Sequence, residues 1–140
     1  MRGKRTPIII NSLLLVWFFL DMLGVSLAGK VLVTRSWQDD GIFFLFYIAA
    51  FICFIFKGKL GRIILTGFLF LWLGLQTYFH WFFTIFGPWE GKIRYFSDTI
   101  KLFKSDLIYI PDLYHIILHI LILCALISMI RYKSIPDNSN

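Results

Sequence analysis

Charge is scarce in this sequence. Only 16% of its 140 residues are Asp, Glu, Lys or Arg, whereas a soluble domain carries about 25%. Hydrophobic residues make up 59% of the chain, and they form long runs with the charges gathered between them. This pattern favours membrane spans over a soluble core. We therefore expect an all-α integral membrane protein, with four transmembrane helices in a compact bundle.

Cysteine is also scarce, and enzyme motifs are absent. The two cysteines, Cys53 and Cys124, lie far apart inside apolar runs. The chain therefore has no C-x-x-C pair for disulfide exchange and no zinc-finger spacing. It contains no G-x-S-x-G, H-E-x-x-H or P-loop motif either, so the sequence names no reaction.

The net charge of +6 does not indicate a nucleic-acid partner. The basic residues form short clusters beside apolar runs, where they orient spans and contact anionic lipid. With both termini and the 57–62 loop on one side, eight of the 14 Lys and Arg residues lie on that side and six on the other. This bias predicts that both termini are cytoplasmic.

The apolar runs predict one domain over residues 1–133, followed by a polar tail over 134–140. The expected spans are 7–27, 41–56, 63–86 and 108–130. The first is longer than the apolar region of a signal peptide, so we expect it to be retained. The second covers only about 24 Å at 1.5 Å per residue, which requires an upright helix or lysines that reach back to the interface.

A short amphipathic helix is expected between the third and fourth spans, over residues 97–105. Ser97 suits its N-cap position, and Ile93, Phe96, Ile100 and Phe103 recur near helical spacing. Such a helix would lie in the membrane interface. An ordinary structured loop is the alternative.

Polar residues inside the expected spans mark the candidate site. Ionisable groups in hydrocarbon cost several kcal/mol, so they indicate a function by default. The candidates for ligand binding or proton relay are Asp21, Gln76, His80, Asp112, His115 and His119.

Spacing and depth bring these residues together. Asp112, His115 and His119 are related as i, i+3 and i+7, so they share one helical face that should point into the bundle. Counting along the spans places Asp21, Gln76 and His115 at one level, about 10 Å below the outer boundary. We expect a buried polar cluster in the outer half of the bundle.

Three kinds of function fit this cluster. It could bind a metal ion, haem or a small ligand, or relay protons or ions, with His80, His115 and His119 as the metal or haem ligands. The chain could instead be a non-catalytic structural or accessory subunit whose polar residues only lock the bundle. The third is a membrane-embedded enzyme acting on a lipid-like substrate, with an Asp–His pair as general base and orienter.

The expected partner is the lipid bilayer. Four helices are few for a complete transport pathway, so transport would require a homo-oligomer or a larger membrane complex. The sequence offers small-residue pairs for helix contact, such as Gly67 with Gly74. We expect these pairs to pack within one protomer.

Overall fold

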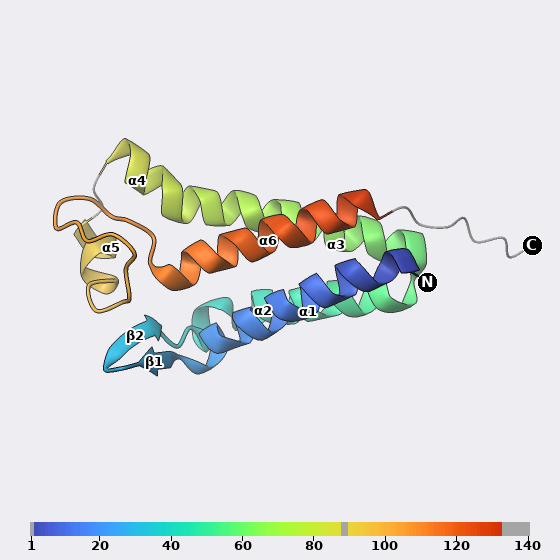
Figure 1. The fold of residues 1–140 in the computed structure, drawn as a ribbon, viewed down its shortest axis with the longest axis horizontal. Coiled ribbons are helices and arrows are strands. Elements are labelled where there is room, and N and C mark those ends of the chain that lie inside the picture. Colours follow the sequence, from blue (N-terminus) through green and yellow to red (C-terminus); the bar gives the residue numbers. More distant parts are fainter. Residues whose placement is uncertain (1, 88–89, 133–140) are drawn as a thin grey trace, which may run out of the picture.

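Four long helices dominate the computed structural model, which describes residues 2–87 and 90–132 (Figure 1). Each is long and apolar enough to cross a membrane. They are α1 (Arg2–Leu23), α2 (Trp37–Phe56), α6 (Leu113–Arg131) and a continuous helix made of α3 (Gly58–Gln76), the π-helix η1 (Thr77–Phe82) and α4 (Phe83–Phe86). The expected all-α membrane fold with four spanning helices is confirmed. The predicted polar tail lies outside the described residues.

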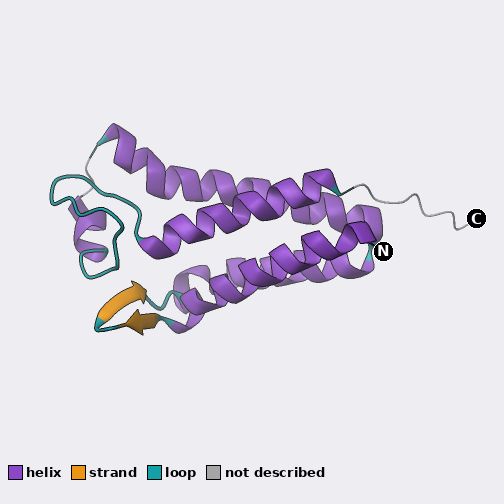
Figure 2. Cartoon of the chain, in the orientation of Figure 1, coloured by secondary structure: helices purple, strands orange, loops and turns teal. Residues whose placement is uncertain are grey.

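The long helices lie side by side in one bundle (Figure 2). Contacts run from α1 to α2, from α2 to α3, from α3 to α6, and from α6 back to α1. α1 begins and α6 ends at the same end, here named the terminal end. The opposite end, the hairpin end, carries antiparallel strands β1 (Val25–Leu27) and β2 (Lys30–Val33) and the short helix α5 (Glu90–Tyr95).

Aromatic side chains fill the middle of the bundle. The ring of Phe18 lies 4.6 Å from that of Trp72 between centroids, and Tyr47 lies 5.2 Å from the same indole. The buried Tyr47 hydroxyl donates a hydrogen bond to the side-chain oxygen of Asn11 (3.1 Å). Lipid is as apolar as this core, so close packing and internal hydrogen bonds hold the helices together in a bilayer.

A glycine allows α2 and α3 to meet at their shared turn. A Cβ on Gly61 would overlap the backbone of Cys53 and Phe54, so only glycine fits there. By contrast, a Cβ on Gly67 or Gly74 would meet nothing within 4 Å. The expectation that Gly67 and Gly74 pack within the protomer is therefore wrong, because both lie on the outward face of α3.

The spans begin and end at other residues than predicted. α1 stops at Leu23 and not at 27, because Gly24 turns the chain with a φ of +72° and the β-hairpin follows. α2 begins at Trp37 and not at 41, with Asp39 and Asp40 in its first turn. Carboxylates are favourable there because of the helix dipole, so the second span is a full 20 residues long.

The third and fourth spans also have different starts. The third begins at Gly58 rather than 63. The fourth begins at Leu113 rather than 108, since Asp112 caps the helix by accepting a hydrogen bond from the backbone N–H of His115 (2.9 Å). Pro111 therefore precedes the helix instead of occupying its first turn.

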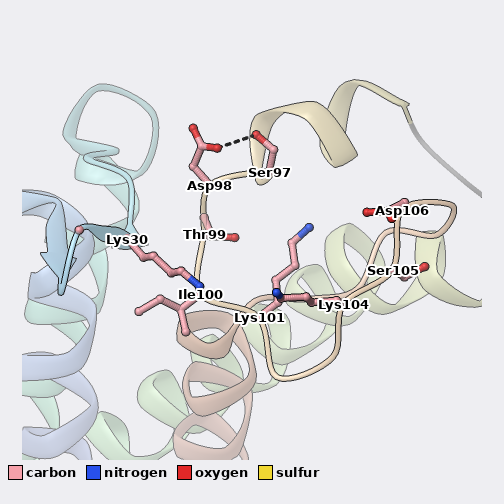
Figure 3. A pocket seen from close by; sticks show the side chains of 10 residues that line it. Lys30, Ser97, Asp98, Thr99, Ile100, Lys101, Lys104, Ser105 and Asp106 are labelled. Atoms are coloured by element: carbon pink, nitrogen blue, oxygen red, sulfur yellow. Dashed lines mark hydrogen bonds between the residues drawn. The ribbon is translucent and has the colours of Figure 1, made fainter.

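The helix between spans three and four exists, but not at residues 97–105. It is α5, at Glu90–Tyr95, and the chain after Ser97 is irregular (Figure 3). There the backbone N–H of Ile100 donates to the carbonyl of Val31 (2.9 Å), and Thr99 forms a β-bridge with Val31. The hairpin thus forms hydrogen bonds with backbone groups that a helix would have needed. This is a tertiary effect, which the periodicity of the local sequence cannot reveal.

Candidate functional site

A polar cleft of about 260 Å³ opens at the hairpin end. Residues from every part of that end line it, including the residue before α2, the first turn of α2, η1, α5 and the first turn of α6. Its lining residues are Val33, Thr34, Ser36, Asp39, Asp40, Gln76, Phe79, His80, Lys92, Tyr95, Phe96 and His115. Three of the six predicted site residues, Gln76, His80 and His115, are among them.

Two histidine rings stack at the wall of this cleft. The centroids of His80 and His115 lie 4.0 Å apart, with ring planes inclined by 28°. His80 is buried, with 6% of its surface exposed. It belongs to the π-helix η1, and such local departures from α-helix are frequent at functional sites because they redirect a side chain.

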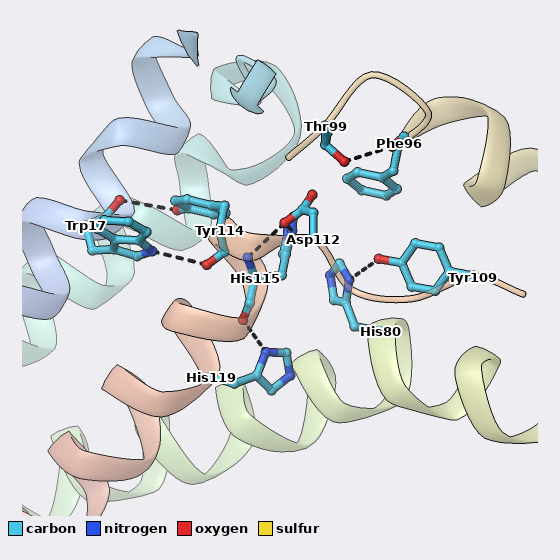
Figure 4. A network of polar contacts seen from close by, with 9 residues as sticks. All are labelled: Trp17, His80, Phe96, Thr99, Tyr109, Asp112, Tyr114, His115 and His119. Carbon is cyan, nitrogen blue, oxygen red and sulfur yellow. Dashed lines mark hydrogen bonds and ion pairs between the residues drawn. The ribbon is translucent and has the colours of Figure 1, made fainter. Parts of the chain in front are cut away.

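Each stacked ring is held at Nδ1 by a buried partner (Figure 4). The Tyr109 hydroxyl lies 2.6 Å from Nδ1 of His80. Nδ1 of His115 donates to the carboxylate of Asp112 (2.8 Å), which also caps the helix. Burial and the nearby charge of Asp112 raise the pKa of the Tyr109 phenol. This hydroxyl therefore stays protonated and can donate a hydrogen bond to Nδ1 of His80.

These bonds determine which nitrogen of each ring carries hydrogen. His80 accepts at Nδ1 and therefore bears its hydrogen on Nε2, whereas His115 donates at Nδ1 and keeps a lone pair on Nε2. The stacked pair thus offers one donor and one acceptor nitrogen. A molecule that contacts both Nε2 atoms would therefore meet one hydrogen-bond donor and one acceptor.

The third histidine lies deeper. Nδ1 of His119 donates to the backbone carbonyl of His115 (2.6 Å). Its Nε2 is buried and has no hydrogen-bond partner in the described part of the chain. The His119 ring meets His80 edge to face, with centroids 6.0 Å apart.

The histidines predicted as metal or haem ligands lie close together, but two of them are stacked. Nitrogen lone pairs lie in the ring plane, so the stacked rings of His80 and His115 direct theirs along nearly parallel planes and not at one ion. Within residues 2–87 and 90–132, no group of three or more His, Cys, Asp or Glu residues is placed to hold a metal ion.

Two predicted residues lie behind the cleft. Asp112 is 1% exposed and acts through His115, while its second oxygen, Oδ2, has no hydrogen-bond partner among the described residues. Asp21 is also buried, and its backbone carbonyl accepts from the N–H of Ser36 (3.0 Å), which fixes the start of α2 beside the cleft.

Sequence reasoning missed Asp39, Asp40, Lys92 and Tyr109. Asp39, Asp40 and Lys92 lie outside the predicted spans, where charged residues look like ordinary loop residues. Tyr109 lies at the start of the predicted fourth span, where a tyrosine looks like an ordinary interfacial residue. The ammonium of Lys92 lies 5.1 Å from the centroid of the Tyr109 ring. Burial lowers the pKa of Lys92 from its ordinary value of 10.5 to about 8. The only signal in the sequence was the pair of adjacent acids before an apolar run, which marks a helix start.

A second cavity, of about 440 Å³, lies between the hairpin turn and the 97–106 segment. Lys30, Lys101 and Lys104 surround it, together with Asp98 and Asp106 (Figure 3). Three ammonium and two carboxylate groups nearly balance, and none of the predicted site residues lines this cavity. The polar cleft is therefore the candidate site.

Comparison of the chain with protein-family models, with curated proteins and with solved structures gave no match. A function must therefore be argued from the geometry and chemistry of the cleft itself.

Proposed function

We propose that this membrane protein binds a small polar ligand in the polar cleft and exchanges a proton with it through His80 and His115. The observation that carries the proposal is the stacked pair at the cleft wall, with Nδ1 of each ring tied to a buried partner. This arrangement leaves both Nε2 atoms for exchange. Tyr109 and Asp112 hold the two rings in position, and each ring exchanges a proton with the ligand at its own Nε2.

The stacking supports the transfer of one proton at a time. Two unit charges 4 Å apart repel by about 4 kcal/mol at an effective dielectric constant of 20. With centroids 4.0 Å apart, His80 and His115 therefore accept a first proton far more readily than a second. The carboxylate of Asp112 stabilises that first proton on His115.

The lining of the cleft supports a polar ligand. Asp39 and Asp40 bring negative charge from α2, and Lys92 brings positive charge from α5. Oε1 of Gln76 is buried, and no hydrogen bond reaches it from the described residues. Such an atom is an acceptor available to a ligand donor. The volume admits a molecule of several non-hydrogen atoms, since one water occupies about 30 Å³.

Nitrogen-15 spectroscopy of histidine in the bilayer-reconstituted protein tests the relay. The chain has three histidines, so each ring can be assigned by substitution. We expect the signals of His80 and His115 to change together when a proton is added to either ring, because the two rings are stacked. His115→Gln should remove this coupling from the His80 signals, whereas His119→Gln should leave it intact.

An unchanged His80 signal in the His115→Gln variant would contradict the relay. If neither ring changes protonation, and the variants only lower stability, the cluster serves only to hold the helices together. That outcome would favour the structural or accessory subunit.

A membrane enzyme is the second candidate, favoured by the bond between Asp112 and His115. A carboxylate that holds the Nδ1–H of an imidazole is the arrangement of an orienter and a general base. Ser36 supplies a hydroxyl to the same cleft. Release of product from reconstituted phospholipid, abolished in Asp112→Asn and in Ser36→Ala, would favour this candidate over the relay.

A further inference from the structure

An apolar groove of about 620 Å³ lies at the terminal end, between the start of α1 and the end of α6. Its apolar lining includes Pro7, Ile10, Cys124 and Ile127. Thr6, Ser128 and Arg131 add polar groups. The groove is remote from the polar cleft, which lies at the hairpin end of the same helices.

Polarity changes along the groove. Arg131 is the last residue of α6, and Cys124 lies seven residues, or about 10 Å, deeper along the helix. The charged group is therefore at the mouth, where the helix leaves the membrane, and the apolar walls run into the hydrocarbon. A phospholipid has the same order, with its phosphate at the interface and its acyl chain below.

The charge of the terminal end favours an anionic lipid. The described Lys and Arg residues there include Lys4, Arg5, Lys57, Lys59, Arg62 and Arg131. The described residues at this end include no Asp or Glu. Basic groups beside a groove between transmembrane helices attract anionic headgroups.

We propose that this groove binds the acyl chain of one anionic phospholipid whose phosphate contacts Arg131. A second copy of the chain is a poorer occupant. A symmetric contact through the groove would bring the two Arg131 side chains and two positively charged ends together, with repulsion in place of complementarity. The lipid, in contrast, adds a negative group to an end where the charged residues that the structure describes are all positive.

Native mass spectrometry of the full chain, released from micelles that contain equal phosphatidylglycerol and phosphatidylcholine of matched acyl chains, tests the site. We expect phosphatidylglycerol to be retained preferentially, at one copy per chain. Arg131→Gln should reduce that preference by about fivefold. Lys59→Gln is the control, because it removes the same charge from the same end but does not line the groove.

A second variant tests the apolar part. Cys124 is exposed, so Cys124→Phe should narrow the groove with little effect on folding. We expect weaker retention of both lipids at an unchanged unfolding temperature. Equal losses in Arg131→Gln and Lys59→Gln, or no preference in the original protein, would overturn the proposal. A disulfide-linked dimer through Cys124 in mild oxidant would assign the groove to a second copy instead.

Discussion

The imidazole rings of His80 and His115 lie face to face, with centroids 4.0 Å apart. One ring comes from η1 and the other from the first turn of α6, so the stack joins two spanning helices. Both rings line the same cleft. A change in the charge of one ring is therefore felt by the other and by the packing of the hairpin end.

The hydrogen bond between Tyr109 and His80 should contribute measurably to the free energy of unfolding. Tyr109→Phe removes the hydroxyl and leaves the buried Nδ1 of His80 without its partner. We expect a loss of about 1–3 kcal/mol in the free energy of unfolding, measured by denaturant titration in detergent. Tyr95→Phe is the control, because Tyr95 is 58% exposed and should change stability by less than about 0.5 kcal/mol. Equal effects would mean that the bond to His80 contributes nothing.

Two substitutions of Asp112 should separate its role as a cap from its charge. Asp112→Ala removes the cap and should cost about 0.5–2 kcal/mol of stability, whereas Asp112→Asn still accepts the backbone N–H of His115 and should cost less. Both remove the negative charge beside Nδ1 of His115. We therefore expect both variants to alter the nitrogen-15 chemical shift of Nδ1 in His115. An unchanged shift in Asp112→Asn would contradict an electrostatic role for Asp112.

The close contact between α2 and α3 should depend on glycine at position 61. Gly61→Ala places a methyl group on the backbone of Cys53 and Phe54, so we expect a loss of about 1–3 kcal/mol or more. Gly67→Ala has open space around it and should stabilise the helix by about 0.5–1 kcal/mol. Unfolding titrations of the two variants in one detergent measure both. A destabilising Gly67→Ala would indicate a contact with a second copy through this face.

The charge of Lys92 should change near pH 8. Burial lowers its pKa from 10.5 to about 8, so the folded protein binds fewer protons than the unfolded chain between these values. Stability should therefore rise with pH across that window, and the effect should vanish in Lys92→Met. The carbon-13 shift of the Lys92 Cε, followed from pH 6 to 12, reports the midpoint directly. A midpoint for Lys92 above pH 10 would show that α5 does not bury it.

The hydrophobic runs determined the membrane class and the number of spans, because about 20 apolar residues are needed to cross the hydrocarbon whatever the neighbours are. The same local reasoning placed Asp112 and His115 on one face of α6. It misplaced the helix ends at the hairpin end. Gly24 and the cap at Asp112 decided those ends, together with the hairpin, which bonds to Ile100.

The sequence by itself predicted that polar groups from several spans lie at roughly one level, since position along a helix follows from a fixed rise per residue. Only the tertiary structure decided what those groups meet. Contacts between segments far apart in the chain stack His80 on His115 and bring Tyr109 to His80. Such contacts also place Lys92 and Asp40 in the lining of the cleft. Helical periodicity gives the face on which a residue lies, but not the neighbour that packs against it.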